Sequence, residues 1–300
     1  MLSILIPTYN YAITKLVNDL HAQAKSLGVD FEIVVAEDGS TKFLEENKKI
    51  ENLNFVHYLP FTNNVGRGVH INRLADAAKF DFLLIMDCDA EVCNNNFLSN
   101  YLSFCAENIV IIGGTAYDEN ENNPNYSLRL KYGKRREAST ANTRKTSKYQ
   151  PFTTFNIFIP KQIFNKIRFN ENIREYGNED TLFRHDLLKQ NFKIIHIDNQ
   201  LIHRGLDDNF IYLQKSETAI KNLYRLYQSK EFPELKNYSN LLNSFLKLKK
   251  LHLISIFNFH FQFFKNLIIK NLTGKNPSLF LFDLYKLGYL SELSYSELSR

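Results

Sequence analysis

The sequence predicts an α/β fold, with a mostly parallel central sheet in residues 1–207 and a helical C-terminal region in residues 208–300. Two observations lead to this prediction. Short apolar runs typical of buried strands alternate with segments of helical periodicity, and the connections between them are short. From about Asp208 onward the apolar residues recur at helical spacing.

The elements of the first region follow one another in a regular order. The expected strands are Leu2–Ile6, Phe31–Ala36, Asn54–Leu59, Phe82–Met86, Ile109–Gly113, Phe152–Ile159 and Lys193–Ile197. The expected helices are residues 13–27, Val69–Phe80, Gln162–Lys166 and Asp180–Asn191. Residues 116–150 interrupt the alternation, because they are polar and rich in Lys and Arg. A stretch of this length is typical of a binding loop or lid, and the alternative is a solvated charged loop.

In the second region, two apolar stripes follow helical spacing. One comprises Ile254, Phe257, Phe261, Phe264 and Ile268, and the other comprises Ile256, Phe259, Phe263 and Leu267. The alternating phenylalanines also permit a strand, but the stripes favour a helix because they extend in both directions. The longest uncharged run, Leu251–Phe264, is shorter than the roughly 20 residues that span a bilayer.

Charge is unevenly distributed along the chain. The net charge is +5, and residues 207–300 hold the whole excess. Residues 236–282 contain lysines and no acid, so we expect an anionic partner here, such as an anionic membrane surface. The alternative is a helical subdomain that only packs on the first region. No RNA or DNA motif appears, so nucleic acid is not an expected partner.

Cysteine use and the first residues indicate the compartment. The three cysteines, Cys88, Cys93 and Cys105, form no disulfide framework and no CxxC pair, which is typical of a reducing compartment. The opening Met1–Pro7 has no basic segment and too short an apolar run for a signal peptide. We therefore expect a cytoplasmic protein.

The pair Asp87-Cys88-Asp89 directly follows the strand-like run Phe82–Met86. Open α/β sheets bind ligands at the carboxyl ends of their strands. Two carboxylates this close repel each other unless a cation or a proton intervenes. A hard divalent ion that carries a phosphorylated ligand is the expected occupant, and the alternative is a solvated turn.

Three further polar clusters accompany this pair. Two of them, Pro7-Thr8-Tyr9-Asn10 and Glu37-Asp38-Gly39-Ser40, also follow expected parallel strands. Together with Asp87-Cys88-Asp89 they should therefore lie along one edge of the sheet. Tyr176-Gly177-Asn178-Glu179-Asp180 opens a helix, where a carboxylate is stabilised by the helix dipole.

These motifs, taken in order, resemble the glycosyltransferase family 2 pattern. The matching pieces are Pro7–Asn10, Asp38–Ser40, Asn64-Val65-Gly66, Asp87–Asp89 and Glu179-Asp180. The resemblance covers about residues 1–205. It implies a GT-A fold, a nucleotide-sugar donor (a UDP-sugar being the expectation), Mn²⁺ or Mg²⁺, and inversion at the anomeric carbon during synthesis of a bacterial cell-surface glycan.

The resemblance also implies roles for single residues. Pro7, Thr8, Tyr9, Asp38, Asn64 and Asp87 would bind the nucleotide sugar. The family often has Arg-Asn in the helix after the Asn-x-Gly segment, whereas this chain has Ile71-Asn72-Arg73. Either Arg67 or Arg73 would therefore supply the positive charge. Asp89, Asp87 and His203 would hold the metal, although a lone histidine is often structural.

On the acceptor side, Asp180 would be the general base and Glu179 would orient the acceptor, or the two roles would be exchanged. Asn156 would meet the acceptor sugar. Arg135 and Arg136, in the 116–150 segment, would meet an anionic acceptor such as a lipid-linked pyrophosphate.

Two other functions compete with glycosyl transfer. A nucleotidyltransferase also uses metal-binding carboxylates, but it would need a Gly-rich basic loop after the first strand, which Pro7–Asn10 does not supply. A non-catalytic protein that binds an anionic ligand is the second alternative. A dehydrogenase is disfavoured because no GxGxxG follows a strand.

Overall fold

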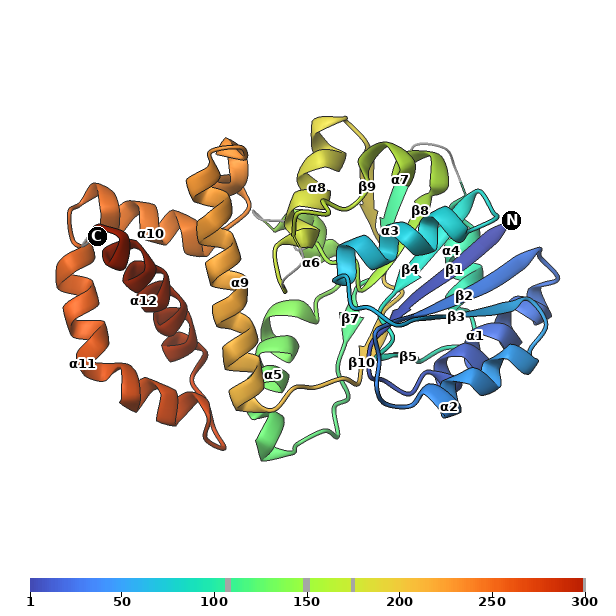
Figure 1. Cartoon of the computed structure of the whole chain (residues 1–300), viewed down its shortest axis with the longest axis horizontal. Coiled ribbons are helices and arrows are strands. Elements are labelled where there is room, and N and C mark those ends of the chain that lie inside the picture. Colours follow the sequence, from blue (N-terminus) through green and yellow to red (C-terminus); the bar gives the residue numbers. More distant parts are fainter. Residues whose placement is uncertain (106–108, 148–151, 174–175, 299–300) are drawn as a thin grey trace. The chain divides into compact units, whose positions relative to one another are not determined.

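The computed structural model describes residues 1–105, 109–147, 152–173 and 176–298 (Figure 1). The chain divides into two compact units. The sheet unit comprises Met1–Asp118, Glu137–Arg174 and Glu179–Gly205. The helical unit comprises Glu119–Arg136, Glu175–Asn178 and Leu206–Arg300.

A seven-stranded sheet forms the centre of the sheet unit. In spatial order its strands are β3 (Val56–Phe61), β2 (Phe31–Asp38), β1 (Leu2–Thr8), β4 (Phe82–Met86), β8 (Asn156–Pro160), β6 (Ile109–Ile112) and β9 (Lys193–His196). Neighbouring strands are parallel, except that β8 runs antiparallel to both β4 and β6. The predicted mostly parallel sheet is therefore confirmed.

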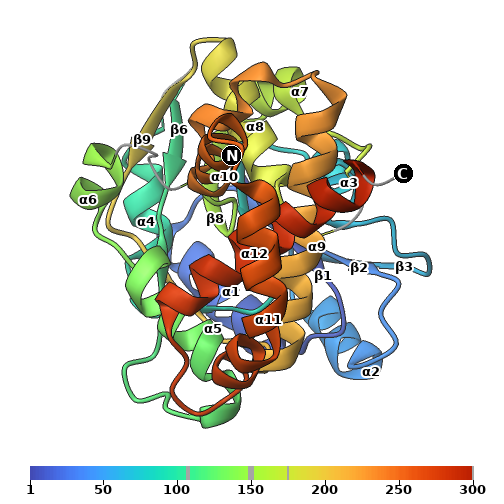
Figure 2. The ribbon, with the colours of Figure 1, turned by 90° about the vertical axis from the view of Figure 1, so that its left-hand side faces the viewer.

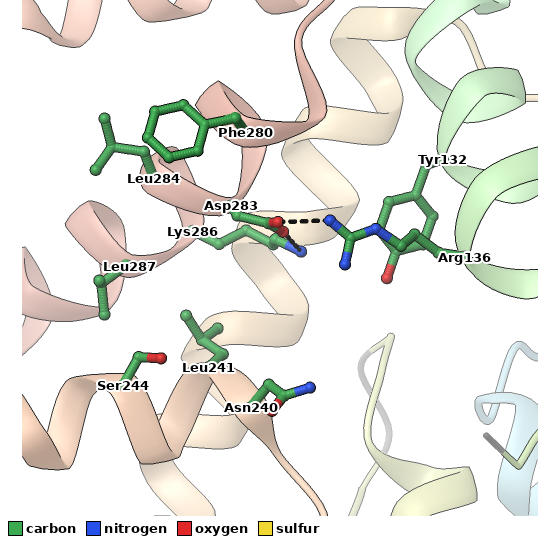
Figure 3. A pocket seen from close by; sticks show the side chains of 10 residues that line it. All are labelled: Tyr132, Arg136, Asn240, Leu241, Ser244, Phe280, Asp283, Leu284, Lys286 and Leu287. Atoms are coloured by element: carbon green, nitrogen blue, oxygen red, sulfur yellow. Dashed lines mark hydrogen bonds and ion pairs between the residues drawn. The ribbon is translucent and has the colours of Figure 1, made fainter. Parts of the chain in front are cut away.

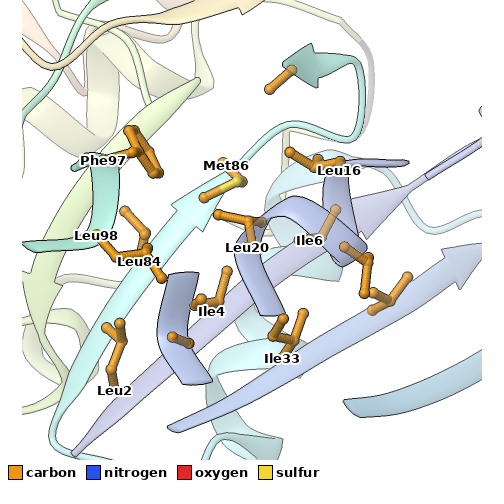
Figure 4. Close-up of a cluster of buried hydrophobic side chains, with 14 of the residues drawn as sticks. Leu2, Ile4, Ile6, Leu16, Leu20, Ile33, Leu84, Met86, Phe97 and Leu98 are labelled. Carbon is orange, nitrogen blue, oxygen red and sulfur yellow. The ribbon is translucent and has the colours of Figure 1, made fainter. Parts of the chain in front are cut away.

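Both faces of this sheet are covered by helices. Because the side chains of a strand alternate between the two faces, each strand contributes to the apolar core on both. On one face Leu2, Ile4 and Ile6 pack with α1 (Thr14–Leu27), as Figure 4 shows. On the other face Leu5 packs with Ile71 of α3 (Arg67–Ala77). Strands buried on both faces need nearly continuous apolar runs, which explains why the sequence revealed them.

The other elements of the sheet unit are short. They are α2 (Leu44–Asn47), η1 (Lys48–Asn52), α4 (Phe97–Leu102), α6 (Ala141–Thr146), α7 (Lys161–Ile167) and α8 (Glu179–Lys189). A small second sheet has the order β5 (Ala90–Val92), β10 (Leu201–His203) and β7 (Thr115–Ala116). The sequence did not predict this second sheet, because its strands are only two or three residues long.

In the helical unit, α12 contacts α9, α10 and α11 (Figure 2). The long helices are α9 (Asn209–Ser229), α10 (Asn240–Lys250), α11 (Ile254–Leu272) and α12 (Leu279–Leu298), and η4 (Pro233–Asn237) precedes α10. Phe261 of α11 and Phe282 and Tyr285 of α12 belong to one buried apolar core, which α9 shares through Tyr212 and Leu213. The helical prediction for this region, including α11 rather than a strand, is confirmed. Among the described helices, none combines the length and the hydropathy needed to span a bilayer.

The segment 116–150, expected to be a binding loop or lid, contains short helices in its described part. That part contains η2 (Pro124–Tyr126), α5 (Ser127–Tyr132), the π-helix η3 (Gly133–Glu137) and α6. Leu128 is fully buried in the core of the helical unit, and the Arg129 guanidinium lies 5.1 Å from the centre of the Tyr212 ring. A few apolar anchors therefore order a segment whose composition is mostly polar. Residues 148–150 of the expected loop lie outside the described residues.

Candidate active site

The carboxyl ends of β1, β2 and β4 meet at one edge of the sheet. The parallel register pairs Thr8 at the end of β1 with Glu37, next to Asp38 at the end of β2. β4 pairs with β1 in the same direction and ends at Met86, directly before Asp87. The three polar clusters that the sequence placed at this edge therefore do lie there.

Arg67, at the start of α3, joins the acids of this edge to those of α8. Its guanidinium donates to Asp87 Oδ1 at 2.5 Å and to Asp180 Oδ1 at 3.4 Å, and it lies 3.9 Å from Glu179 Oε1. It also donates to the Thr154 hydroxyl at 2.8 Å. Burial alone would lower the pKa of Arg67, but the three carboxylates raise it above its ordinary value, so the side chain stays charged.

Of the two arginines that the sequence offered, Arg67 is the one among the acids. Arg73 lies on α3 with its guanidinium 5.4 Å from the centre of the Phe61 ring. The structure thus places the positive charge at the start of α3 rather than six residues along it.

Asp180 and Glu179 begin α8 but have different surroundings. Asp180 accepts hydrogen bonds from the hydroxyl and the backbone N–H of Thr154. Glu179 is more buried, and within the described part of the chain its Oε2 has no hydrogen-bond partner. Burial, together with the charge of Asp180, raises the pKa of Glu179 to about 7, although Arg67 opposes this shift.

Asp89 faces His203 across the small sheet. The pairing of β5 with β10 sets Ala90 opposite His203, and His203 Nε2 lies 2.9 Å from Asp89 Oδ2. His203 Nδ1 lies 3.3 Å from the Tyr117 hydroxyl. A Cβ on Gly205 would come within 2.1 Å of Asp89 Oδ2, so the lack of a side chain at Gly205 leaves room for the carboxylate.

These residues fit a divalent ion with two protein ligands. Across the described residues, no group of three or more His, Cys, Asp or Glu is placed to hold a metal. Asp89 and His203 nevertheless offer an oxygen and a nitrogen donor side by side, and Mn²⁺ and Mg²⁺ sites often take their remaining ligands from substrate phosphates and water. Asp87, the other predicted ligand, is paired with Arg67 instead.

The Asp38 carboxylate supports a loop. It accepts from the backbone N–H of Val65 at 2.9 Å and of Gly66 at 3.2 Å, and the Asn64 amide donates to the Asp38 carbonyl at 3.0 Å. Gly39 has a φ of +73°, and a Cβ there would lie 2.6 Å from Asn64 N. The loop of residues 64–66, which directly precedes Arg67, therefore packs on the carboxyl end of β2.

The remaining donor-side residues differ in exposure. Pro7 is buried within β1, and Thr8 is buried with its hydroxyl donating to the Ile6 carbonyl. Tyr9 is exposed at the strand end. An exposed ring is available to stack on a ligand, whereas Pro7 and Thr8 shape the turn that presents it.

Asn156, which the sequence placed on the acceptor side, lies inside the sheet unit. Its side chain is fully buried, accepts from the Tyr101 hydroxyl at 2.5 Å, and donates to the carbonyls of Gly114 and Asn199. These bonds fix the segments around β8 and leave the amide enclosed within the protein. The bonds of Asn156 are therefore structural ones, and its contact with an acceptor sugar stays a prediction.

Arg135 and Arg136 lie in the helical unit. Arg136 donates to Asp283 at 2.8 Å. It lines a cavity of about 490 Å³ with apolar residues of α10 and α12, and Lys286 lies beside Asp283 (Figure 3). Contact of either arginine with an acceptor stays a prediction.

Sequence reasoning missed three residues of the site. Thr154 binds both Arg67 and Asp180, Tyr117 contacts His203, and Gly205 accommodates Asp89. Thr154 belongs to a polar Thr-Thr pair just before the apolar run of β8, which was a weak signal. The contacts of Tyr117 and Gly205 depend on the small sheet, and no local pattern reveals them.

Known structures show the same fold. The chain matches S. aureus TarS residues 1–349 in complex with UDP-GlcNAc, with a TM-score of 0.53, 19% identity, and coverage of 99% of this chain and 91% of that one. It matches the mannosyltransferase PcManGT of Pyrobaculum calidifontis, in complex with GDP-Man and Mn²⁺, with a TM-score of 0.58, 12% identity, and coverage of 98% and 87%. Against a longer TarS chain the match spans 39% of that chain. The predicted GT-A fold is thus confirmed.

Sequence comparison identifies the family. A search of curated protein sequences gives no match. The family model described as glycosyl transferase family 2 matches residues 3–192, which is more than half of the chain. This match decides against the nucleotidyltransferase and the non-catalytic alternatives. The chain belongs to glycosyl transferase family 2 and is a glycosyltransferase.

Proposed function

We propose that this enzyme transfers a sugar from a nucleotide sugar, specifically a UDP-sugar, to a glycan or lipid-linked acceptor in the synthesis of a cell-surface polysaccharide. The observation that carries the proposal is the acidic cluster around Arg67 at the carboxyl edge of the sheet. The nucleotide-sugar complexes of TarS and PcManGT support this class of donor.

Within this proposal, Asp89 and His203 hold Mn²⁺ or Mg²⁺. When bound, such an ion neutralises the charge that develops on the diphosphate leaving group. The chain itself fixes the two ligands, because the small sheet aligns them at 2.9 Å and Gly205 leaves space beside Asp89. The Mn²⁺ in the PcManGT complex supports this choice of metal.

Asp180 is the proposed general base of an inverting transfer. A base must reach the acceptor hydroxyl, and the side chain of Asp180 is 24% exposed against 13% for Glu179. Thr154 and Arg67 hold its carboxylate in one orientation. The opposite assignment has one point in its favour, because a base with a pKa of about 7 is well matched to neutral pH.

The proposed acceptor and the proposed location are based on the basic residues of the chain. Arg135 and Arg136 would meet a lipid-linked diphosphate acceptor. The proposed location is the cytoplasm, with residues 236–282 against the inner face of the cytoplasmic membrane. That position would bring a cytoplasmic donor and a membrane-bound acceptor to the same enzyme.

Thermal unfolding with nucleotides tests the donor and the metal together. A ligand that binds the folded state raises the melting temperature by mass action. We expect UDP and UDP-sugars to stabilise the protein in the presence of Mn²⁺, and to stabilise it more than GDP or GDP-sugars do. The variant Asp89→Asn should melt normally without ligand but lose the metal-dependent part of the shift. The absence of any metal-dependent shift with UDP or GDP would contradict the proposal.

A further inference from the structure

Helix α11 is apolar on two opposite sides. A helix turns by about 100° per residue, so Ile254, Phe261 and Ile268 form one side, which is buried against the rest of the helical unit. The other side is a stripe spaced by three and four residues, formed by Ile256, Phe259, Phe263 and Leu267. We call these four residues the outer stripe.

The outer stripe is strongly exposed. The relative exposure is 60% for Ile256, 72% for Phe259, 74% for Phe263 and 63% for Leu267. Leu251 and Leu253, just before the helix, and Phe264 beside the stripe are exposed as well. A contiguous apolar surface of this kind marks an interaction site rather than an ordinary solvated face.

The charges that flank the stripe in sequence are all positive, and the one acid paired with α11 itself in the described residues is Glu292 of α12, which holds Lys265 at 2.8 Å. Lys247, Lys249 and Lys250 end α10 just before it, and Lys270 and Lys275 follow it, all of them exposed. No acidic residue occurs between 236 and 282. The surface therefore combines large aromatic and aliphatic side chains with a rim of positive charge.

An apolar stripe with a positive rim fits an anionic membrane better than a second copy of the chain. In a symmetric dimer the same patch meets itself, so two outer stripes in contact would bring their lysine rims together and repel. An anionic bilayer offers apolar chains to the stripe and negative headgroups to the lysines at the same time. A helix with an apolar outer face and a polar rim lies along such an interface.

We infer that the outer stripe of α11 inserts into the headgroup region of a membrane rich in anionic lipid, with the helix lying in the plane of the surface. This inference rests on the peripheral location in the proposed function, and it specifies the surface that makes the contact. It does not depend on the chemistry of the sheet unit.

Vesicle sedimentation of the 300-residue chain tests the inference. The probes are phosphatidylcholine vesicles with and without one third of phosphatidylglycerol. We expect binding to the mixed vesicles that weakens as salt is raised, because charge contacts are screened. Phe259→Ser with Phe263→Ser should weaken binding by about tenfold or more, in line with the hydrophobic contribution of a buried aromatic side chain.

A matched control separates the stripe from exposed aromatics in general. Phe55 lies in the sheet unit and is 63% exposed, so Phe55→Ser should bind vesicles like the unaltered protein. Changing Lys249, Lys250 and Lys270 together to Gln should remove the preference for phosphatidylglycerol. Circular dichroism of each variant checks that the helices are retained.

Two results would overturn the inference. One is equal vesicle binding by the unaltered protein and the double phenylalanine variant. The other is no vesicle binding by the unaltered protein. If that protein is then a dimer that the double variant converts to a monomer, the stripe is an interface between copies. Donor binding is measured separately by the melting shift with UDP and Mn²⁺. Loss of that shift with intact vesicle binding would refute the proposed donor and metal and leave the membrane contact of the outer stripe standing.

Discussion

Arg67 decides the electrostatics of the site at the scale of single residues. Three carboxylates lie within 4 Å of its guanidinium, and without a cation they would repel each other strongly. Arg67 binds Asp87 and leaves Asp89 to His203. The two aspartates of the Asp-x-Asp motif therefore have different partners, which favours Asp89 over Asp87 as the ligand in the proposed metal site.

Glu179 should make the stability of the protein depend on pH. Its pKa is about 7 in the folded state, above the usual 4.5 of a glutamate, because it is buried next to Asp180. The folded state then holds a proton that the unfolded state releases, so the free energy of unfolding should fall as pH rises from about 4.5 to 7 and stay level beyond. The loss is at most about 3 kcal/mol.

Urea unfolding at several pH values measures this effect. Glu179→Gln should remove the fall, because the amide does not titrate. Glu46→Gln changes an exposed glutamate at the start of α2 and should leave the pH profile unchanged. The same pH profile for Glu179→Gln and for the unaltered protein would show that Glu179 titrates normally.

Substitution of the paired acids should identify the general base. If Asp180 is the base, Asp180→Asn should lower the rate of sugar transfer by roughly 10²–10⁴-fold, the usual contribution of general base catalysis. Donor binding, measured by the melting shift with UDP and Mn²⁺, should change little. Glu179→Gln should lower the rate less and leave its pH dependence intact.

The opposite assignment, with Glu179 as the base, predicts a different pH dependence of transfer. If Glu179 is the base, transfer by the unaltered enzyme should increase through pH 7, where its carboxyl loses the proton. Asp180→Asn would then keep that increase but move it to lower pH, because the charge of Asp180 helps to raise the pKa of Glu179, and Glu179→Gln would abolish transfer. Near-normal turnover by Asp180→Asn would rule out the assignment of Asp180.

At the scale of elements, the strands were predictable where both of their faces are buried. Such strands have continuous apolar runs, so Leu2–Ile6 and Phe82–Met86 stood out, and the polar clusters after them marked the sheet edge. The direction of a strand leaves no such trace. The reversal of β8 depends on its pairing with β4 and β6, which are distant in sequence.

The same limit explains what the sequence could not predict about the site. The acidic motifs are local, and their positions were predictable from the strands before them. Their partners are not local: Asp89 meets His203 over 114 positions, and Arg67 meets Asp180 over 113. Thr154 lies near Arg67 and Asp180 because β8 begins beside the end of β4. Only the pairing of these two strands, which are distant in sequence, brings it there.

The whole molecule consists of two units with different cores. The nucleotide site as proposed lies within the sheet unit, and the outer stripe of α11 lies within the helical unit. A change in the core of the helical unit should therefore disturb its own stability before it disturbs donor binding.

Phe261→Ala tests this separation. Phe261 is buried in the helical core, and a Cβ on Gly288 would touch its ring, so truncation leaves a cavity and should lower the free energy of unfolding of the helical unit by about 3–5 kcal/mol. Hydrogen exchange should show faster opening of α11 and α12, while amides of β1 and β4 stay protected. The melting shift with UDP and Mn²⁺ should persist. Equal loss of protection in β1 and β4 would show that the two units unfold as one.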